Sequence, residues 1–394
     1  MLKDTNNMIE FNSTDIILDK IFKKSFSHFT KIEKKIIESD FKTITKNISS
    51  SRIENFFLSN VKKFASDLNI DEKYLKELQY KSSIRAIRTL ENLRFASLVG
   101  AELKKRQIEH YFLKGIPLIK HIYKNPALRQ LSDIDILISK EDLPELILIL
   151  KSFDFQTEVW DSLNGADYVL YKNPNPKHNF LPSQFDIHTS IFKNPRKDKI
   201  FMNYLRDYCN FSHKDNKLSL CSVEILFIHL LFHGTTHSSY NVGPMFIMDM
   251  LNVIRCDYLD HGLVEKMVTS LEIEYEYNNL ASVLSEYENI PIKIMGAKES
   301  SISNQDLKKI FFSQPSNSGI YKPIIINSFF QRMHFVIQHF FNKKNILHHS
   351  LEKFTFSKAL RHYQMQFKRH IFSLFGSKDS IEISKKRFKL LQKL

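Results

Sequence analysis

Cysteine is scarce in this sequence of 394 residues, which contains only Cys209, Cys221 and Cys256. Three cysteines are too few for a disulfide framework, and their spacing lacks the short paired pattern of a zinc site. We therefore expect reduced thiols that pack as small apolar side chains.

Long apolar runs are also missing. No stretch approaches the roughly 18 consecutive apolar residues that would span a bilayer. The segment from Met1 to Asn12 lacks the basic start and apolar run of a secretory signal. These absences predict a cytoplasmic protein, and the length together with 43% apolar residues predicts two or three domains with packed cores.

Helix-breaking residues are rare in the first quarter of the chain, which has no glycine before Gly100 and no proline between residues 13 and 106. Apolar residues recur there at spacings of three and four, as at Ile53, Phe56 and Phe57. Residues 1–106 are therefore predicted to form an N-terminal helical region.

Positive charge is concentrated at one end. Residues 301–394 contain 17 Lys or Arg and four Asp or Glu, a net charge of +13 out of +14 for the whole chain. Aromatic residues lie among these cations, a mixture that suits the phosphates and bases of RNA or the headgroups of an anionic membrane. A helical region with a solvated basic surface explains the same pattern, and both interpretations stay open.

Two aspartates, Asp133 and Asp135, stand one residue apart inside an apolar run. On a strand, positions i and i+2 project from the same face, while Ile134 and Ile136 point the other way into a core. Paired carboxylates repel unless a cation lies between them, and Mg²⁺ prefers oxygen ligands. The pattern thus predicts a metal site, with two solvated aspartates at a strand end as the alternative.

Two neighbouring segments strengthen this prediction. Residues 110–123 have the pattern of a strand, a tight turn at Lys114 and Gly115, and a helix, an arrangement that suits a bound phosphate. Residues 180–188 look like a further strand that carries a third acid, Asp186. A turn-rich segment separates it from the strand-like residues 168–172, so we expect these two strands to pair as an antiparallel hairpin.

In this order, the residues resemble the polymerase-beta-like nucleotidyltransferase superfamily, and within it a poorly characterised bacterial family with a Lys-Gly turn, a Tyr, an Arg and then Asp-x-Asp. The matching residues here are Lys114, Gly115, Tyr123, Arg129, Ser132, Asp133 and Asp135, with Asp186 at the position of the third acid. The family's histidine-rich helix matches residues 229–237, and the likeness covers roughly residues 85–255.

The resemblance implies an α+β fold: a small mixed nucleotidyltransferase-type sheet with helices, embedded between helical N- and C-terminal regions. The expected divisions are the helical region 1–106, a nucleotidyltransferase core at 107–195, a helical region at 196–300 that completes the cleft, and a basic helical region at 301–394.

The resemblance also implies a set of ligands. Asp133, Asp135 and Asp186 would be the catalytic residues and would hold two Mg²⁺ or Mn²⁺ ions. A nucleoside triphosphate, expected to be ATP, would contact Lys114, Gly115, Arg129, Ser132, His233 and His237. One departure concerns the turn, because Gly115-Ile116 stands where the superfamily usually has Gly-Ser. The turn therefore offers no hydroxyl to the terminal phosphates, and Lys114 or Arg129 would have to bind them instead.

Three histidines, His229, His233 and His237, are spaced by four residues and would form one stripe on a continuous helix. They could bind zinc, face the nucleotide or acceptor, or simply pack in the core, although the Glu of a His-Glu-x-x-His motif is absent. Asp249 lies on an apolar helix and needs a partner if it is buried, for which these histidines are the candidates.

The function implied by the resemblance is Mg²⁺-dependent transfer of a nucleoside monophosphate to a hydroxyl of a small molecule, sugar precursor or protein, with release of pyrophosphate. The basic residues 301–394 favour an alternative, a toxin-like enzyme that modifies tRNA. The missing hydroxyl after Gly115 favours another, a nucleotide-binding protein without activity.

Overall fold

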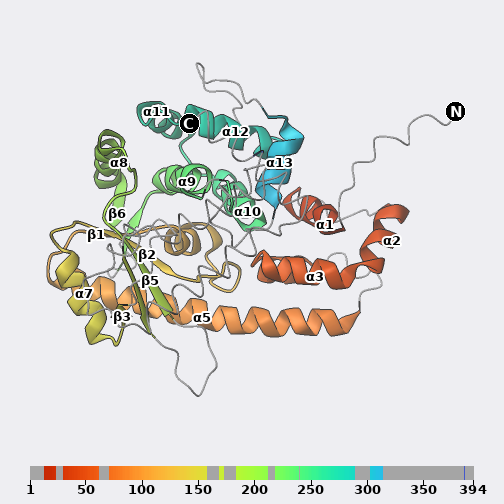
Figure 1. The fold of residues 1–394 in the computed structure, drawn as a ribbon, viewed down its shortest axis with the longest axis horizontal. Coiled ribbons are helices and arrows are strands. Elements are labelled where there is room, and N and C mark those ends of the chain that lie inside the picture. The colour runs from red at the N-terminus through yellow and green to blue at the C-terminus, as the bar shows by residue number, and fades with distance from the viewer. Residues whose placement is uncertain are drawn as a thin grey trace, which may run out of the picture.

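A computed structural model describes residues 13–23, 30–61, 71–157, 168–172, 183–211, 218–238, 240–288, 302–313 and 386. These residues form an α+β fold in which helices surround one mixed sheet (Figure 1), and this confirms the predicted fold class. Within this part of the chain, no helix has the length and apolar character needed to cross a membrane.

The N-terminal helices confirm the prediction from glycine and proline scarcity. They are α1 (Ser13–Phe22), α2 (Lys31–Ser39), α3 (Phe41–Ser50), α4 (Glu54–Val61) and α5 (Glu72–Lys105). Of these, α5 has 34 residues, which corresponds to about 51 Å. The side chain of Asp71 caps its first turn by accepting a hydrogen bond from the amide of Lys73.

The rest of the chain alternates strands and helices before it becomes helical again. In order, it contains β1 (His110–Phe112), α6 (Gly115–Pro117), the π-helical turn η2 (Leu118–Tyr123), β2 (Ile134–Ile138), α7 (Leu143–Ser152), β3 (Gln156–Thr157), β4 (Tyr168–Lys172), β5 (Ser183–His188), α8 (Pro195–Tyr208), β6 (Cys209–Phe211), β7 (Ser219–Cys221), α9 (Val223–Phe232), the π-helical turn η3 (His233–His237), α10 (Pro244–Ile254), α11 (His261–Ser270), α12 (Glu274–Leu284) and α13 (Asn304–Phe312).

The described strands form a sheet in the order β3-β4-β5-β2-β1-β7-β6. Two neighbouring pairs, β2 with β5 and β1 with β7, are parallel, and the remaining pairs are antiparallel. The predicted hairpin of β4 and β5 is confirmed, with Val169 opposite Asp186. The centre of the sheet is thus made by β2, which lies between β5 and β1.

The alternation of side chains divides β2 and β5 between two cores. Ile134, Ile136 and Ile138 join Phe185 and Ile187 in a cluster with apolar residues of α5 and α7, which lie on one side of the sheet in Figure 1. Leu137 belongs to the other cluster, which contains residues of α8 and α9. The acidic side chains alternate with the isoleucines, so they project from the face toward α9.

The first half of α5 packs against α3 and α4, and the second half packs on the sheet. Between these halves, α5 holds the segment that leads into β2. The hydroxyl of Thr89 accepts a hydrogen bond from the amide of Leu131, and the amide of Asn92 donates one to the carbonyl of Leu131 at 2.8 Å. The N-terminal helices therefore help to position the residues just before Asp133.

The strand, turn and helix predicted at residues 110–123 are present, but the special backbone conformation belongs to the lysine of the turn. Lys114 has φ 47° and ψ −105°, a region that residues with a side chain rarely adopt. Gly115 is needed for a different reason, because a Cβ there would lie 2.3 Å from Cδ1 of Leu131. This contact brings the turn directly against the segment that carries the acids.

A second close approach occurs where the histidine-rich helix changes its geometry. The α-helix α9 ends at Phe232, and the chain continues as the π-helical turn η3, which contains Gly234. A Cβ on Gly234 would lie 2.4 Å from Cε2 of Phe246 in α10. Glycine at this position therefore allows η3 and α10 to pack together.

We expect Gly234→Ala to lower the free energy of unfolding by about 1–3 kcal/mol, because the added methyl group overpacks the contact with Phe246. Urea unfolding measures this loss. Gly262→Ala is the matched control, since its nearest neighbour is the side-chain oxygen of Asp260 at 3.3 Å, a longer contact than the 2.4 Å at Gly234. Equal effects of the two substitutions would contradict the packing argument.

Candidate functional site

The three predicted acids come together at the centre of the sheet. Asp135 on β2 and Asp186 on β5 are paired in the parallel register, and Asp133 directly precedes β2. Asp135 and Asp186 are 3% and 2% exposed. Since burial disfavours charged groups and like charges repel, this arrangement requires positive charge close by.

Two side chains supply positive charge or hydrogen bonds to Asp135. The ammonium group of Lys114 forms an ion pair with Oδ1 of Asp135, and Nε2 of His188 lies 3.0 Å from the same oxygen. Although burial opposes ionisation, Lys114 and His188 hold the pKa of Asp135 well below its usual range. In return, Asp135 raises the pKa of the Lys114 ammonium despite its burial. Asp135 is therefore a fixed anion.

Asp186 behaves in the opposite way. Burial, followed by the negative charges of Asp133 and Asp135, raises the pKa of Asp186 to about 8. Three carboxylates that are mutually repulsive form a suitable oxygen donor set for a hard divalent cation, so the residues present fit Mg²⁺ or Mn²⁺. In this arrangement, no set of three His, Cys, Asp or Glu side chains among the described residues is spaced as a metal site.

In the histidine row of His229, His233 and His237, the first two lie close enough to Lys114 and Asp135 for both charges to affect their pKa. Ring centroids are 6.4 Å apart for His229 and His233, and 6.0 Å apart for His233 and His237. Burial, with the charge of Lys114 as the next cause, lowers the pKa of His229 and of His233 well below the usual value, so both imidazoles are neutral. Nδ1 of each of these two rings is buried without a hydrogen-bond partner.

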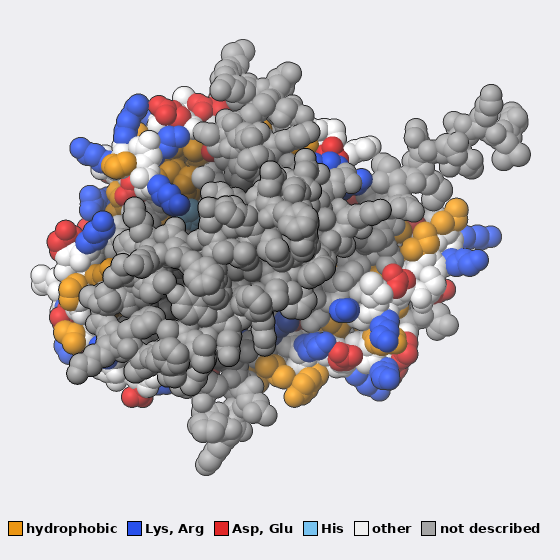
Figure 2. All heavy atoms as spheres, viewed as in Figure 1, with side chains coloured by type: hydrophobic (Ala, Val, Ile, Leu, Met, Phe, Trp, Pro, Cys, Tyr) orange, Lys and Arg blue, Asp and Glu red, His pale blue; other side chains and the backbone are white. Residues whose placement is uncertain are grey.

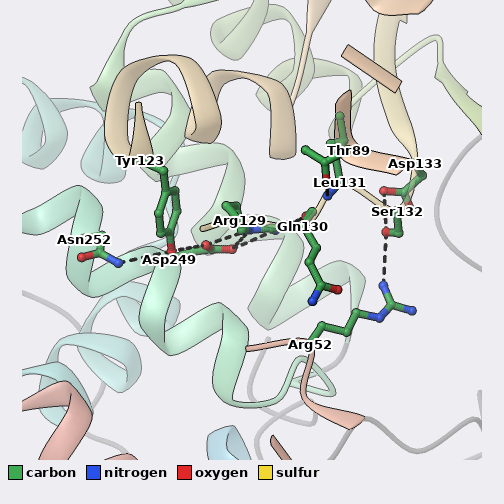
Figure 3. A network of polar contacts seen from close by, with 10 residues as sticks. All are labelled: Arg52, Thr89, Tyr123, Arg129, Gln130, Leu131, Ser132, Asp133, Asp249 and Asn252. Carbon is green, nitrogen blue, oxygen red and sulfur yellow. Dashed lines mark hydrogen bonds and ion pairs between the residues drawn. The ribbon is translucent and has the colours of Figure 1, made fainter. Parts of the chain in front are cut away.

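Arg129 and Asp249 form a buried ion pair, shown in Figure 3. Nε of Arg129 lies 3.0 and 3.1 Å from the two carboxylate oxygens, and Nη2 lies 2.9 Å from Oδ2. The hydroxyl of Tyr123 donates to Oδ1 of Asp249 at 2.8 Å, and Asn252 donates to that hydroxyl at 3.2 Å. The expectation that a histidine pairs with Asp249 was wrong, because the partners are Arg129 and Tyr123.

This geometry bears on the phosphate role expected for Arg129. Its guanidinium also donates to the backbone carbonyl of Gln130, and the side chains of Arg129 and Asp249 are 11% and 4% exposed. The ion pair joins the segment before β2 to α10, so Arg129 has a clear structural role here. Contact of Arg129 with a phosphate stays a prediction.

On the other flank of the acids, cationic side chains come from the N-terminal helices. Nη1 of Arg52 donates to Oγ of Ser132 at 3.1 Å, and Oγ donates to Oδ1 of Asp133 at 3.0 Å (Figure 3). The guanidinium of Arg88 donates to the carbonyl of Ser132. Ser132 therefore links Asp133 to Arg52.

Sequence reasoning missed His188, Arg52 and Arg88. His188 had a detectable signal, because it stands two residues after Asp186 on the same strand and so shares its face. The two arginines had none, since Arg52 lies in the turn after α3 and Arg88 on α5, both distant in sequence, and they reach Ser132 only through the tertiary fold.

The sequence profile of a family described as an uncharacterised nucleotidyltransferase matches residues 38–287. The chain belongs to this nucleotidyltransferase family. The match extends beyond the likeness seen in residues 85–255, and it includes α3, α4 and α5. No curated protein and no solved structure matches the chain.

Most of the basic region expected at residues 301–394 lies outside the described residues, so its RNA or membrane contacts stay predictions. Within the described part, Lys and Arg side chains are interspersed with Asp and Glu on the face drawn in Figure 2. This agrees with the small net charge of the first 300 residues of the chain.

Removal of Asp249 is expected to be strongly destabilising. In Asp249→Ala, the guanidinium of Arg129 stays buried without its carboxylate, and we expect a loss of about 3–5 kcal/mol in the free energy of unfolding. Urea unfolding measures it. Glu77→Ala is the control, because it breaks an ion pair with Lys81 whose side chains are 57% and 41% exposed, a kind of pair that contributes little to stability. Similar losses in both variants would argue against a buried structural pair.

Asp186 is expected to make the metal-free protein less stable as the pH rises. Its folded pKa of about 8 lies above the ordinary aspartate pKa of 3.8, so between these values the folded state binds a proton that the unfolded state has lost. Stability therefore falls with rising pH through this window. Asp186→Asn stays neutral, and we expect it to melt above the wild type at pH 8 but not near pH 4, when measured with a chelator present.

The same two proteins test the fit to a cation. Mg²⁺ added at pH 8 is expected to raise the melting temperature of the wild type more than that of Asp186→Asn, because binding to the folded state stabilises it. An identical pH dependence and an identical response to Mg²⁺ in the two proteins would contradict the proposal that Asp186 lies close enough to Asp133 and Asp135 to have a raised pKa and to share a cation with them.

Proposed function

We propose that this protein is a Mg²⁺-dependent nucleotidyltransferase that transfers a nucleoside monophosphate from a nucleoside triphosphate to a hydroxyl group and releases pyrophosphate. One observation carries the proposal: Asp135 and Asp186 are in register on adjacent parallel strands, next to Asp133 and the cation of Lys114. Family membership supports the same general reaction.

Asp133, Asp135 and Asp186 would hold the divalent cations. When bound, these ions supply Lewis-acid stabilisation of the negative charge that develops on the phosphates during transfer. In their absence, the ammonium of Lys114 neutralises the carboxylate of Asp135. The carboxylates are already assembled on one face of the sheet, so binding requires little rearrangement of the backbone.

The residues near the acids are suited to a triphosphate. Lys114, once it leaves Asp135, brings an ammonium group to the phosphates, and the amide of Gly115 begins the helix that follows the turn. His233 and His237 lie in η3, and a neutral His233 can donate or accept a hydrogen bond. Ser132 presents its hydroxyl beside Asp133.

The reaction forms one bond and breaks one. The acceptor oxygen attacks the α-phosphorus, and the bond between that phosphorus and the oxygen leading to the β-phosphate breaks, with pyrophosphate leaving. Asp186, which lies beside the other two acids, would lose its own proton when the cations bind, and its carboxylate would then accept the hydroxyl proton. Water must be kept out of this site, and the burial of Asp135 and Asp186 serves that purpose.

The acceptor class is proposed to be a small molecule, a sugar precursor or a protein. A tRNA acceptor is a second candidate, favoured by the net charge of +13 in residues 301–394 and the aromatics among them. A labelled nucleotide incubated separately with small-molecule, protein and RNA fractions distinguishes these candidates by the fraction that becomes labelled.

Replacement of a metal-binding carboxylate is expected to reduce turnover by several powers of ten, because charge compensation is greatest in the transition state. The variants are Asp133→Asn, Asp135→Asn and Asp186→Asn, and the measurement is pyrophosphate release with Mg²⁺. Asp154→Asn is the matched control, since Asp154 is an exposed aspartate at φ 65°, a conformation that asparagine tolerates well.

Near-normal pyrophosphate release by the three variants would rule out the proposed site. Binding of ATP and Mg²⁺ by the wild type in calorimetry, without any release of pyrophosphate in the presence of the three fractions, would favour the non-catalytic nucleotide-binding alternative.

A further inference from the structure

Three arginines from the N-terminal helices converge on the segment just before β2. Arg52 follows α3, while Arg85 and Arg88 lie on α5 one turn apart. Arg52 reaches Oγ of Ser132 and Arg88 reaches its carbonyl, so both guanidinium groups stand beside Asp133. This flank lies outside the turn at Lys114 and Gly115, where the family resemblance places the phosphates.

The three arginines of this cluster face three acids, Glu54, Asp133 and Glu91. Arg85 is paired with the buried carboxylate of Glu54. Burial lowers the pKa of Arg88, and the charges of Arg52 and Arg85 lower it further, against the opposing effect of Asp133 and Glu91. Since Asp133 is itself an expected cation ligand, it cannot balance both arginines once a divalent ion is bound. The cluster then has one positive charge in excess, and the exposed guanidinium of Arg52 can bind an anion.

The backbone of Arg52 follows the end of α3. Its φ is 59°, in the left-handed region that glycine and asparagine adopt more easily than arginine does. The side chain is exposed and carries its guanidinium to Ser132. This conformation is the usual one at a helix C-terminus, because the amide of Ile53 donates to the carbonyl of Ile48, and it leaves the side chain of Arg52 directed at Ser132.

The turn at Gly115 cannot supply a second group for the phosphates. Ile116, which follows it, is 0% exposed and belongs to the apolar cluster beneath the sheet. Arg129 is committed to Asp249 by three contacts. Among the cations near the acids, Arg52 is exposed and can reach a ligand.

We propose that Arg52, with Arg88 behind it, binds the β- and γ-phosphates of the nucleoside triphosphate. This inference rests on the proposed function and names the residue that replaces the missing hydroxyl of the turn. A guanidinium can donate two parallel hydrogen bonds to phosphate oxygens. The hydrogen bond from Ser132 to Asp133 then couples occupation of this phosphate site to the position of a metal-binding carboxylate.

The test uses Arg52→Asn in the full-length protein, because asparagine suits φ 59° and removes the charge without adding strain. The probes are inorganic pyrophosphate, the four ribonucleoside triphosphates as α,β-methylene analogues, and the corresponding monophosphates, each with Mg²⁺ in calorimetry. We expect binding of pyrophosphate and of the preferred triphosphate analogue to weaken by about tenfold to a hundredfold. Binding of the monophosphate and of Mn²⁺ alone should change less than about twofold, and the melting temperature should stay equal or rise.

Two further variants make the result specific. Lys124→Asn removes an exposed cation at φ 56°, so it matches Arg52→Asn in charge and backbone, and we expect it to bind all probes as the wild type does. Ser132→Ala removes the link to Asp133 but keeps Arg52, and it should weaken pyrophosphate binding less than Arg52→Asn does. If Ser132→Ala weakened it equally, Arg52 would act only by positioning Asp133, and the proposal would be overturned.

The outcomes separate this inference from the proposed function. If Arg52→Asn binds the triphosphate analogue as tightly as the wild type does, the phosphate role of Arg52 is overturned. The nucleotidyltransferase proposal is then left intact. A wild type that binds none of the probes would overturn both.

Discussion

The structure depends on the accommodation of negative charge at the centre of a sheet. Asp135 and Asp186 are paired across β2 and β5, and both side chains are almost completely buried. Carboxylates in such a place are stable only with cations or protons. Lys114 supplies a cation to Asp135, whereas Asp186 has its pKa raised to about 8 and retains a proton at neutral pH. The neighbouring helices and turns are arranged around this requirement.

The short segment before β2 receives support from both sides of the molecule. From the N-terminal helices, Thr89 and Asn92 bind Leu131, and Arg88 binds Ser132. From the C-terminal helices, Asp249 on α10 binds Arg129. Because each contact fixes the backbone near Asp133, the acids cannot keep their positions without either helical region. This gives a physical reason why the family match extends through residues 38–287 rather than over the strands alone.

The sequence predicted the features that depend on local periodicity. The alternation around Asp133 and Asp135 correctly placed the isoleucines in a core, and the turn-rich segment correctly predicted the hairpin of β4 and β5. Partners from distant parts of the sequence were not predictable. A histidine was therefore expected as the partner of Asp249, and the contact of Arg52 with Ser132 was missed. The positive φ of Lys114 was also missed, since a Lys-Gly pair leads one to place the unusual conformation on the glycine. Each of these features is decided by tertiary contacts that leave no local pattern.

The strain at Lys114 is best understood together with its ion pair. Its φ of 47° and ψ of −105° are unfavourable, and the attraction between its ammonium and Asp135 offsets this cost. Once a divalent ion neutralises Asp135 in the proposed reaction, that attraction weakens, and the nearest new anion is the triphosphate itself. Lys114 then exchanges one anion for another while its backbone stays in place. The same residue can thus keep the carboxylates assembled before the substrate arrives and neutralise the substrate afterwards, which a serine at this turn could not do, because a hydroxyl carries no charge.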